Sequence, residues 1–310
     1  MFSVLIATYN GEKYILEQLE SVVSQTVPPD TIYIYDDCST DNTIKLISDW
    51  KKRNSVKNVI VRKNSENKGY TRNFLEALFE IDDEFIFLCD QDDVWKKDKI
   101  ESYRSFLDGQ SDKHLPLLVT SGYSVTDENL YVVREQHVSA DSTHRVALKS
   151  FLKDCSYPGM TFCLNRALKE KAKELFSVEN IAFHDYFLSL VALKYGQLFC
   201  IQKNLVLYRQ HGNNQLGVSG KRNKNRHYWE KVLRQKCAEN QIATFLFPDD
   251  EFISRKTEFS EKRLENFRRG KCRLFSVFEY IRFYGLKSFF ADFYYTKILR
   301  GAQDESLTNN

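Results

Sequence analysis

Three carboxylates close together mark the first place where this sequence could do chemistry. Asp90, Asp92 and Asp93 directly follow the apolar run Phe85–Cys89. Like charges this close repel one another, and each carboxylate resists removal from water. A divalent cation removes that cost, because Mg²⁺ and Mn²⁺ prefer oxygen ligands and keep positions free for phosphate oxygens. The three carboxylates alone would favour a solvated acidic turn capping a helix that starts near Lys96, but the buried strand upstream and the N-terminal pattern favour a metal site.

Two further polar clusters also follow apolar runs. Thr8–Gly11 ends the run Phe2–Ala7, and Asp36–Asp41 follows the β-rich run Thr31–Tyr35. Short apolar runs bounded by turn-forming residues are typical of buried strands. Because the same arrangement occurs after three runs, we interpret the clusters as parts of one site.

Helical patterns separate these strands and predict how the clusters are positioned. Apolar residues recur with helical spacing between residues 15 and 23, Asp41 can cap a second helix, and a third is expected over Tyr70–Glu80. Strands that alternate with helices of this length indicate βαβ units on a mostly parallel sheet. Ligands of such sheets bind beyond the carboxyl ends of the strands, so the three clusters should meet there.

The second half of the chain continues the mixed pattern. We expect a strand at Leu117–Thr120, a tight turn at Pro158-Gly159 and a helix over Tyr186–Lys194 that His184 and Asp185 open. The following elements are expected to be two short strands, Leu198–Ile201 and Leu205–Leu207. By helix grammar alone, Asp185 would be an N-cap.

Composition places the protein among ordinary globular proteins. Its 310 residues are 42% hydrophobic and 28% charged, and the seven cysteines are scattered without a C-x-x-C motif. An odd, scattered set argues for a reducing compartment and against a disulfide framework or a zinc site. The N-terminus lacks a signal-peptide pattern, and no apolar stretch is long enough to span a membrane. We therefore expect a cytoplasmic protein.

The C-terminal third is basic and aromatic. Residues 221–310 carry 19 Lys and Arg against 12 Asp and Glu, and Arg273–Arg300 holds ten aromatic residues. Aromatic residues interleaved with basic ones fit an interfacial helix at the inner face of the cytoplasmic membrane. Burial in a core, or helix-mediated homodimerisation, would explain the same pattern. Nucleic-acid binding has little support, because no recognisable module is present.

The combined motifs resemble a known enzyme family. VLIATYNG, YIYDDCSTDNT, NKGYTRN and FIFLCDQDDVW resemble the family-2 inverting glycosyltransferases that use nucleotide sugars. The later motifs SYPGMTFCLN, FHDYFLSLVALKYG and LYRQHGNN are similar to the bacterial rhamnan, O-antigen and capsule subgroup, especially its dTDP-rhamnose-dependent rhamnosyltransferases. This resemblance implies the α/β GT-A fold, a Rossmann-like, mostly parallel sheet flanked by helices, with a helical C-terminal extension.

The resemblance also implies a division of labour along the chain. Residues 1–110 would bind the nucleotide sugar, residues 111–220 would bind the acceptor and hold the catalytic base, and residues 221–310 would form the extension. Thr8 and Tyr9 would line the base pocket, with Asp37 accepting a hydrogen bond from the pyrimidine N3–H and Asp36 supporting that loop.

The remaining implied roles lie near the diphosphate. Lys68 and Arg72 would lie near the nucleotide, Asp90 would contact the ribose or the ion, and Asp92 would ligate Mg²⁺ or Mn²⁺ bridging the diphosphate. His211 would make a late third contact to metal or phosphate, although a lone loop histidine is as well explained by local hydrogen bonds.

Asp185 is the implied catalytic base. A carboxylate at the start of a helix is held ionised by the helix dipole, and inversion needs one base to take the acceptor hydroxyl proton. The wider family has an acidic residue where this chain has His184, which leaves the sugar specificity open. Arg209 could face phosphate or a surface carboxylate.

The sequence therefore predicts a metal-dependent inverting glycosyltransferase of bacterial surface polysaccharide synthesis. The first-choice donor is dTDP-rhamnose, with a UDP-hexose or UDP-N-acetylhexosamine as the alternative, and the acceptor would be a lipid-linked glycan. A nucleotidyltransferase would show a Gly-rich, basic loop after the first strand, and ATYNG is not that loop. A non-catalytic sugar-nucleotide or glycan-binding protein remains the rival from another class.

Overall fold

A computed structural model describes most of the chain, and it divides into two compact units. Unit 1 comprises Met1–Ala147 and Tyr157–Ser219, and unit 2 comprises Leu148–Ser156 and Gly220–Asn310. The described residues are 1–110, 114–136, 143–153, 157–177, 183–212, 226–269 and 283. Each unit is described by itself.

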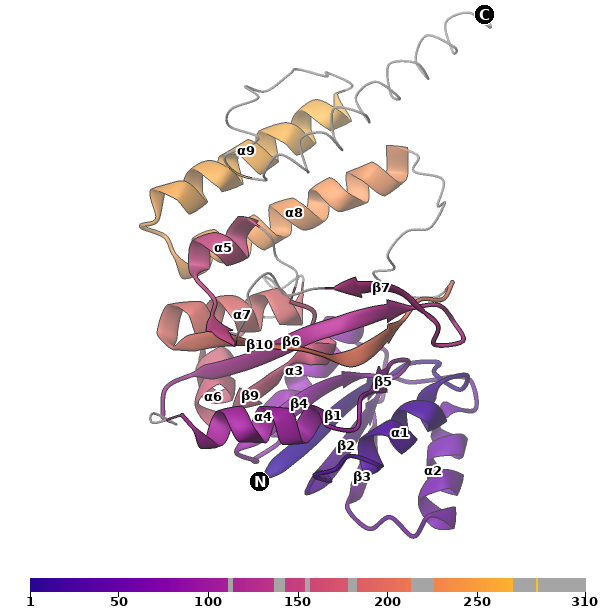
Figure 1. The fold of residues 1–310 in the computed structure, drawn as a ribbon. Coiled ribbons are helices and arrows are strands. Elements are labelled where there is room, and N and C mark those ends of the chain that lie inside the picture. The colour runs from indigo at the N-terminus through magenta and orange to yellow at the C-terminus, as the bar shows by residue number, and fades with distance from the viewer. Residues whose placement is uncertain are drawn as a thin grey trace, which may run out of the picture. The chain divides into compact units, whose positions relative to one another are not determined.

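Four parallel strands form the first half of the unit 1 sheet (Figure 1). They are β1 (Phe2–Thr8), β2 (Thr31–Asp36), β3 (Val59–Lys63) and β4 (Phe85–Asp90), in the spatial order β3-β2-β1-β4. The chain order therefore reverses between β1 and β4, which is where open α/β sheets bind their ligands. The predicted βαβ units are confirmed.

The second half of the sheet mixes strand directions. β9 (Cys163–Asn165) runs antiparallel to β4 and to β6 (Leu117–Thr126), and β10 (Gln197–Arg209) runs parallel to β6. Three short strands complete the sheet, β5 (Val94–Trp95), β7 (Val132–Gln136) and β8 (His144–Arg145), paired with β10, β6 and β10 respectively.

Helices cover both faces of this sheet (Figure 1). One face carries α1 (Ile15–Val23), α2 (Thr43–Arg53) and α4 (Lys99–Asp108). The other face carries α3 (Tyr70–Glu80), α6 (Arg166–Leu175) and α7 (His184–Tyr195). Each helix buries the apolar stripe that its spacing predicts, as Ile15, Leu19 and Val22 of α1 illustrate.

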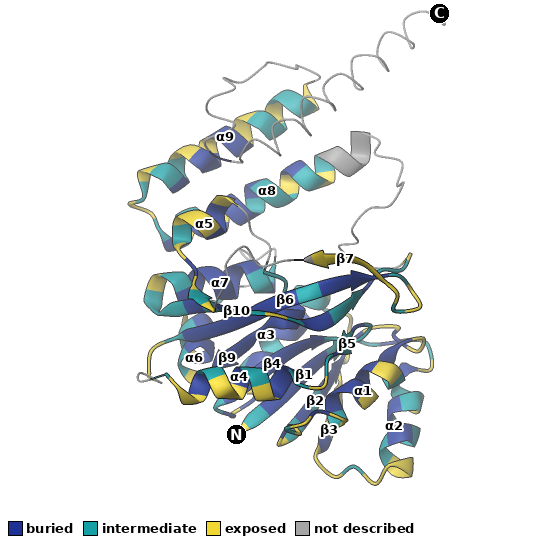
Figure 2. Ribbon diagram, viewed as in Figure 1, coloured by how far each residue is buried: buried dark blue, intermediate teal, exposed yellow. Residues whose placement is uncertain are grey.

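The strands of unit 1 form its core, which Figure 2 shows as a buried layer. Val4, Ile6, Ile34 and Phe87 are fully buried in one hydrophobic cluster with residues of α1, α2 and α4. The run Phe85–Cys89 is thus the central buried strand that its composition predicts. Burial of these side chains stabilises the fold by roughly 25 cal/mol per Å² of apolar surface.

One predicted boundary is wrong. The two strands expected at Leu198–Ile201 and Leu205–Leu207 are one continuous strand, β10, whose register with β6 shifts between Ile201 and Val206. A bulge adds residues without ending the ladder, and the polar residues of the bulge imitate a turn in the sequence. The short strands β5, β7, β8 and β9 were not predicted, because so few residues carry no clear alternation.

Unit 2 is helical, as expected for the extension. Its described part contains the helices α5 (Leu148–Lys153), α8 (Arg226–Leu246) and α9 (Glu251–Arg268), together with the residue Phe283. Asp250 caps α9 by accepting a hydrogen bond from the Ile253 amide at 3.0 Å. Most of Arg273–Arg300 lies outside the described residues. Within the part of the chain that is described, every helix is too short or too polar to cross a membrane.

Candidate active site

The three polar clusters meet at the carboxyl edge of the sheet. Thr8 of β1 lies opposite Asp36 of β2 in the strand register, and Ala7 lies opposite Asp90 of β4. The predicted convergence is therefore confirmed, and it falls at the reversal of strand order between β1 and β4.

Asp36 joins the ends of β1 and β2. Its fully buried carboxylate accepts hydrogen bonds from the Thr8 hydroxyl at 2.9 Å, from the Ser39 amide at 2.8 Å and from the Ser39 hydroxyl. The Thr8 hydroxyl therefore points to Asp36, whose carboxylate joins β1 to the loop that follows β2.

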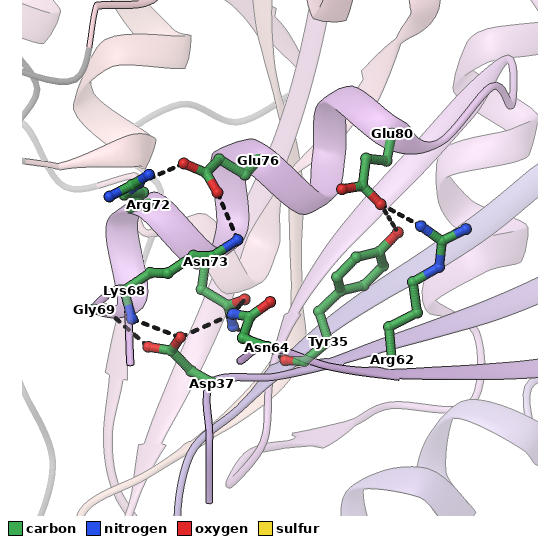
Figure 3. Close-up of polar contacts among 10 residues, drawn as sticks. All are labelled: Tyr35, Asp37, Arg62, Asn64, Lys68, Gly69, Arg72, Asn73, Glu76 and Glu80. Atoms are coloured by element: carbon green, nitrogen blue, oxygen red, sulfur yellow. Dashed lines mark hydrogen bonds and ion pairs between the residues drawn. The ribbon is translucent and has the colours of Figure 1, made fainter. Parts of the chain in front are cut away.

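Asp37 holds the beginning of α3 (Figure 3). Its carboxylate accepts hydrogen bonds from the backbone amides of Lys68 and Gly69, both at 2.8 Å, and from the Asn64 side-chain amide at 2.9 Å. Gly69 has φ of +80°, a left-handed conformation that glycine adopts without strain. Asp37 is almost fully buried, and its carboxylate serves mainly to fix this loop through these hydrogen bonds.

Lys68, which lies just before α3, and Arg72 of α3 share the carboxylate of Glu76 (Figure 3). The Lys68 ammonium lies 2.7 Å from Glu76, and the Arg72 Nε donates to the other Glu76 oxygen. Burial alone would raise the pKa of Glu76, but the hydrogen bonds from the two cations lower it below the usual range. The two cations, both expected near the nucleotide, form one cluster with a surplus positive charge.

A second carboxylate on α3 makes a similar bridge away from this cluster (Figure 3). Glu80 accepts a hydrogen bond from the Tyr35 hydroxyl at 2.9 Å and pairs with Arg62. Closer to the start of α3, the Asn73 side chain donates to the Tyr35 carbonyl at 3.0 Å. Helix α3 is therefore held against β2 by two polar contacts to Tyr35.

Gln91, between the cluster's first two aspartates, links the acidic loop to β1. Its side chain accepts from the Tyr9 amide at 2.9 Å and donates to the Tyr9 carbonyl at 3.0 Å. A Cβ on Gly11 would lie 2.2 Å from the Gln91 Oε1, so a larger residue there would displace the Gln91 side chain from this position. The Tyr9 side chain is 44% exposed and free of this backbone clamp. Sequence analysis missed the role of Gln91.

Burial dominates the electrostatics of Asp90 and Asp93. Burial raises the pKa of Asp90 to about 7, with further contributions from the charges of Asp92 and Asp185. Burial and the charges of its two neighbours also raise the pKa of Asp93 well above its usual range. One Asp93 oxygen accepts from the Arg209 amide at 3.1 Å, and the other is buried without a partner among the described residues. This cluster is short of compensating positive charge.

Asp92 lies against His211. The His211 Nε2 is 2.8 Å from an Asp92 carboxylate oxygen, and the Tyr14 ring packs on the imidazole with centroids 4.7 Å apart. Among the described residues, no three His, Cys, Asp or Glu side chains are arranged as a complete metal site. Two protein ligands still fit Mg²⁺, which typically takes one or two carboxylates and completes its shell with water and phosphate oxygens.

Asp185 lies in the first turn of α7 but is not its N-cap. The helix begins at His184, and Phe183 occupies the N-cap position. The Asp185 carboxylate is partly exposed and accepts a hydrogen bond from the Tyr186 amide at 2.8 Å. The alternative that Asp185 is the N-cap of α7, which the residue pattern alone favours, is therefore wrong.

His184 is a buried imidazole packed between α3 and a turn. Its ring stacks on Phe74 with centroids 4.5 Å apart. A Cβ on Gly159 would lie 2.6 Å from its Nε2, so the glycine permits the close approach. Neither ring nitrogen has a hydrogen-bond partner among the described residues, and burial lowers the pKa of the imidazole.

Arg209 supports the site from within the protein. The guanidinium donates to the Asp92 carbonyl at 2.9 Å and to the Glu128 carbonyl at 2.7 Å, and it pairs with Glu17. The side chain is almost completely buried. These contacts match the carboxylate alternative of the sequence analysis, because Glu17 is a half-exposed surface residue.

Lys99 is the other site residue that sequence analysis missed. It is fully buried, and its ammonium donates to the Met160 carbonyl at 2.8 Å and lies 3.6 Å from the centroid of the Trp95 ring. Burial lowers its pKa to about 7. A lysine in the polar stretch KKDKI carries no sequence signal of burial, so it could not have been found from the pattern.

Known proteins share sequence similarity with this chain. Residues 3–129 match the family described as Glycosyl transferase family 2, which confirms the resemblance carried by the motifs. The dTDP-rhamnosyl transferase RfbG of Shigella flexneri is 29% identical over 225 residues, which are 69% of this chain and 74% of the relative. The poly(ribitol-phosphate) beta-N-acetylglucosaminyltransferase TarS of Staphylococcus aureus is 35% identical over 34% of this chain and 19% of its own length.

Solved structures confirm the GT-A fold. Residues 1–349 of S. aureus TarS in complex with UDP-GlcNAc superpose with a TM-score of 0.59 at 20% identity, covering 86% of this chain and 81% of that chain. The mannosyltransferase PcManGT of Pyrobaculum calidifontis, in complex with GDP-Man and Mn²⁺, gives 0.54 at 19% identity, covering 85% of this chain and 69% of that chain. At these identities the likeness shows the fold alone.

Proposed function

We propose that the protein is a metal-dependent, inverting glycosyltransferase that moves a sugar from a nucleotide diphosphate to a lipid-linked glycan in bacterial surface polysaccharide synthesis. The observation that carries the proposal is the under-compensated acidic cluster at the end of β4. It includes Asp92 against His211, and it lies within electrostatic reach of Asp185. A donor diphosphate with its cation supplies the missing positive and polar partners.

The preferred donor is dTDP-rhamnose. The relative RfbG, which aligns with 69% of this chain by sequence, is a dTDP-rhamnosyl transferase. A UDP-hexose or UDP-N-acetylhexosamine is the alternative, because TarS has been solved with UDP-GlcNAc and another relative, WfaP of Escherichia coli, is a UDP-Glc-dependent glucosyltransferase that is 29% identical.

The nucleotide is proposed to lie against the ends of β1 and β2. A carboxylate has about four lone-pair sites, and three donors of the chain reach Asp37, so its carboxylate can still accept one pyrimidine N–H. The exposed Tyr9 ring offers a face for the base. Arg72 uses its Nε for Glu76, which leaves its terminal nitrogens to face an anionic ligand.

Asp92 and His211 are proposed to hold Mg²⁺ or Mn²⁺, with Asp90 contacting the ion or the ribose. The bound cation would stabilise the negative charge that grows on the leaving diphosphate. The Tyr14 ring and the Arg209 contact to the Asp92 carbonyl fix this pair in place before any ligand arrives.

Asp185 is proposed to take the proton of the attacking acceptor hydroxyl. It is partly exposed, held at a helix N-terminus, and close enough to the acidic cluster to raise the pKa of Asp90. In an inverting transfer, the acceptor oxygen forms its bond to the sugar on the face opposite the departing diphosphate, so the base must stand apart from the cation.

A lipid-linked acceptor would bring the protein to the inner face of the cytoplasmic membrane. The helices proposed for that contact, or for a homodimer, are those of Arg273–Arg300, most of which lies outside the described residues. The surplus of basic residues in 221–310 is the feature that supports attachment to anionic lipid.

A thermal-shift panel tests the proposal. Wild type and Asp92→Asn are each melted with dTDP-rhamnose, UDP-glucose, UDP-galactose or UDP-GlcNAc, in Mn²⁺ or in EDTA. A ligand at 100 times its Kd stabilises by about 2.7 kcal/mol. We expect one donor to raise the melting temperature only in Mn²⁺ and only in wild type. No shift under any condition would remove the main support for a nucleotide-sugar enzyme.

A further inference from the structure

One turn of unit 1 is bonded to the central strand and also contacts the first turn of α7. It is the 3₁₀ turn η1, Gly159–Thr161, whose three residues are buried. Directly after it, the Phe162 carbonyl accepts a hydrogen bond from the Leu88 amide of β4 at 3.0 Å. A Cβ built on Gly159 would lie 3.5 Å from the Asp185 Cβ, which is ordinary van der Waals contact. η1 therefore connects the strand that ends in the acidic cluster with the residue proposed as the base.

Buried side chains hold η1 in place. The Thr161 and Thr120 hydroxyls share a hydrogen bond at 2.6 Å, and the Tyr103 hydroxyl donates to the Thr161 carbonyl. The Lys99 ammonium donates to the Met160 carbonyl at 2.8 Å. All of these side chains are fully buried, so a displaced turn would leave polar groups of the core without partners, which costs free energy. η1 is therefore a rigid neighbour for the residues that pack on it.

The His184 imidazole fills the space between η1 and α3. One face of the ring stacks on Phe74 with 20° between the two planes, and the Tyr70 ring stands at 76° to it. The edge of the ring meets Gly159, because a Cβ built there would lie 2.6 Å from Nε2 and 3.4 Å from Cδ2. Side chains packed this closely have little freedom to shift. The position of the imidazole is thus tied to that of its own backbone, at the start of α7.

Gly159 matters through its missing side chain and not through its backbone conformation. Among the glycines of the described chain only Gly69 has a positive φ, so alanine adopts the backbone of Gly159 without strain. An alanine methyl at this position would nevertheless overlap the His184 Nε2. Since hydrogen bonds hold η1, the imidazole must give way, and the first turn of α7 moves with it.

We propose that Gly159 and His184 are positioning residues for the base. Their contact fixes the first turn of α7 against η1 and so sets where the Asp185 carboxylate stands relative to the acidic cluster at the end of β4. This inference rests on the proposed role of Asp185. Both residues act through Asp185, because the His184 ring nitrogens are buried away from any ligand and Gly159 has no side chain. A general base must lie within hydrogen-bond reach of the proton that it takes, so a small displacement is costly.

The test separates the position of the base from the binding of the donor. Turnover is measured in Mn²⁺ as release of the nucleoside diphosphate from each donor of the thermal-shift panel. Water is the acceptor, because a base that takes a proton from a sugar hydroxyl can also take one from water. The Kd of each donor is measured by calorimetry, and the free energy of unfolding by urea denaturation.

The variants are Gly159→Ala, His184→Ala and the two combined, with Asp185→Asn as the reference for a lost base. Gly109→Ala is the matched control. Gly109 ends α4, and a Cβ there would lie 3.5 Å from the nearest atom, the Phe106 carbonyl oxygen, so the added methyl meets no overlap.

Gly159→Ala should lower kcat by about 10²-fold, the effect of misplacing a reacting group by about 1 Å. His184→Ala should lower kcat by about tenfold, because the turn loses its contact but meets no overlap. The double variant should match His184→Ala within a factor of about two, since the methyl then meets no imidazole; independent effects would multiply to about 10³-fold. The donor Kd of every variant, and the kcat of Gly109→Ala, should stay close to those of wild type.

Folding of the variants has its own outcomes. Gly159→Ala that unfolds alone but folds in the His184→Ala background would support the contact, and the loss of turnover in His184→Ala at unchanged donor Kd would then support its role. Unfolding of Gly159→Ala in both backgrounds would make the glycine a residue of η1 only and overturn the inference.

The kinetic outcomes distinguish the inference from the proposed function. Full turnover in His184→Ala, or effects that multiply in the double variant, would overturn the inference while Asp185→Asn still shows the loss of a base. A donor Kd that weakens as much as turnover falls would assign both residues to donor binding instead. Full turnover in Asp185→Asn, or none in wild type with any donor, would overturn the proposed function and the inference with it.

Discussion

Two acidic segments at the same edge of the sheet are treated very differently by the protein. Asp36 and Asp37 follow β2 and receive hydrogen bonds from six groups of the chain, among them the backbone amides that begin α3. The segment Asp90–Asp93 follows β4, where burial raises the pKa of two carboxyls and leaves one oxygen unpartnered within the described chain.

The two segments differ in how far the chain itself compensates their charge. A buried carboxylate that accepts most of its hydrogen bonds from the chain contributes to folding whether or not a ligand is bound. A cluster that the chain leaves short of positive charge costs folding free energy, and this is typical of groups kept for a ligand. The residue types alone, Asp-Asp in one segment and Asp-x-Asp-Asp in the other, do not distinguish the two situations.

The largest expected effect belongs to the base beside the under-compensated cluster. Asp185→Asn should lower kcat by roughly 10²–10⁴-fold, the usual contribution of a general base. Donor binding in Mn²⁺, measured by thermal shift, should stay close to that of wild type, because Asp185 serves the acceptor. The surface variant Asp49→Asn, which loses only an exposed pair with Lys45, is the control and should keep full turnover. Full activity in Asp185→Asn would favour a binding protein.

The second prediction compares how much each acidic segment contributes to the free energy of unfolding. Asp37→Asn should lower the free energy of unfolding by about 2–3 kcal/mol, because an amide nitrogen replaces an oxygen that buried donors require. Asp92→Asn should change it by less than about 1 kcal/mol, because its loss also relieves repulsion between neighbouring carboxylates. Urea denaturation in EDTA measures both. Equal losses in the two variants would mean that both segments are scaffold.

The fold was predictable where the sequence repeats one pattern over several elements. Phe85–Cys89 and the helical stripe between residues 15 and 23 are long enough to identify a strand and a helix, and the alternation fixes the parallel half of the sheet. The antiparallel half was less predictable. β9 has three residues, and the bulge in β10 places polar residues inside a strand, so local pattern fails in both cases.

The candidate site was predictable in position but not in its interior support. Site residues that directly follow strands, such as Asp92 and Asp37, can be recognised because they are acidic residues next to apolar runs. Lys99 and Gln91 act through burial and distant contacts, which no spacing in the sequence encodes. The same limit applies to Arg209, whose partners Glu17 and Glu128 come from remote parts of the chain.

The smallest expected effect concerns the imidazole next to the base. Burial holds the pKa of His184 below its ordinary 6.5, so the unfolded chain binds a proton that the folded protein does not as the pH falls below that value. The stability that the neutral His184 contributes is therefore fully present above about pH 6.5. Below that pH, the free energy of unfolding declines by about 1 kcal/mol over the first pH unit.

His184→Leu should remove this part of the pH dependence. Leucine keeps an apolar contact with Phe74 and eliminates two buried nitrogens that have no partner in the described chain. Denaturation at pH 8, 6.5 and 5.5 should show the difference in unfolding free energy between variant and wild type shifting in favour of the variant as the pH falls. Parallel curves would mean that His184 finds a proton-stabilising partner in the folded protein. In that case the protein itself would compensate the charge of His184, as it does for Asp36 and Asp37. The first turn of α7 would then contain both a structural residue, His184, and a residue of the proposed site, Asp185.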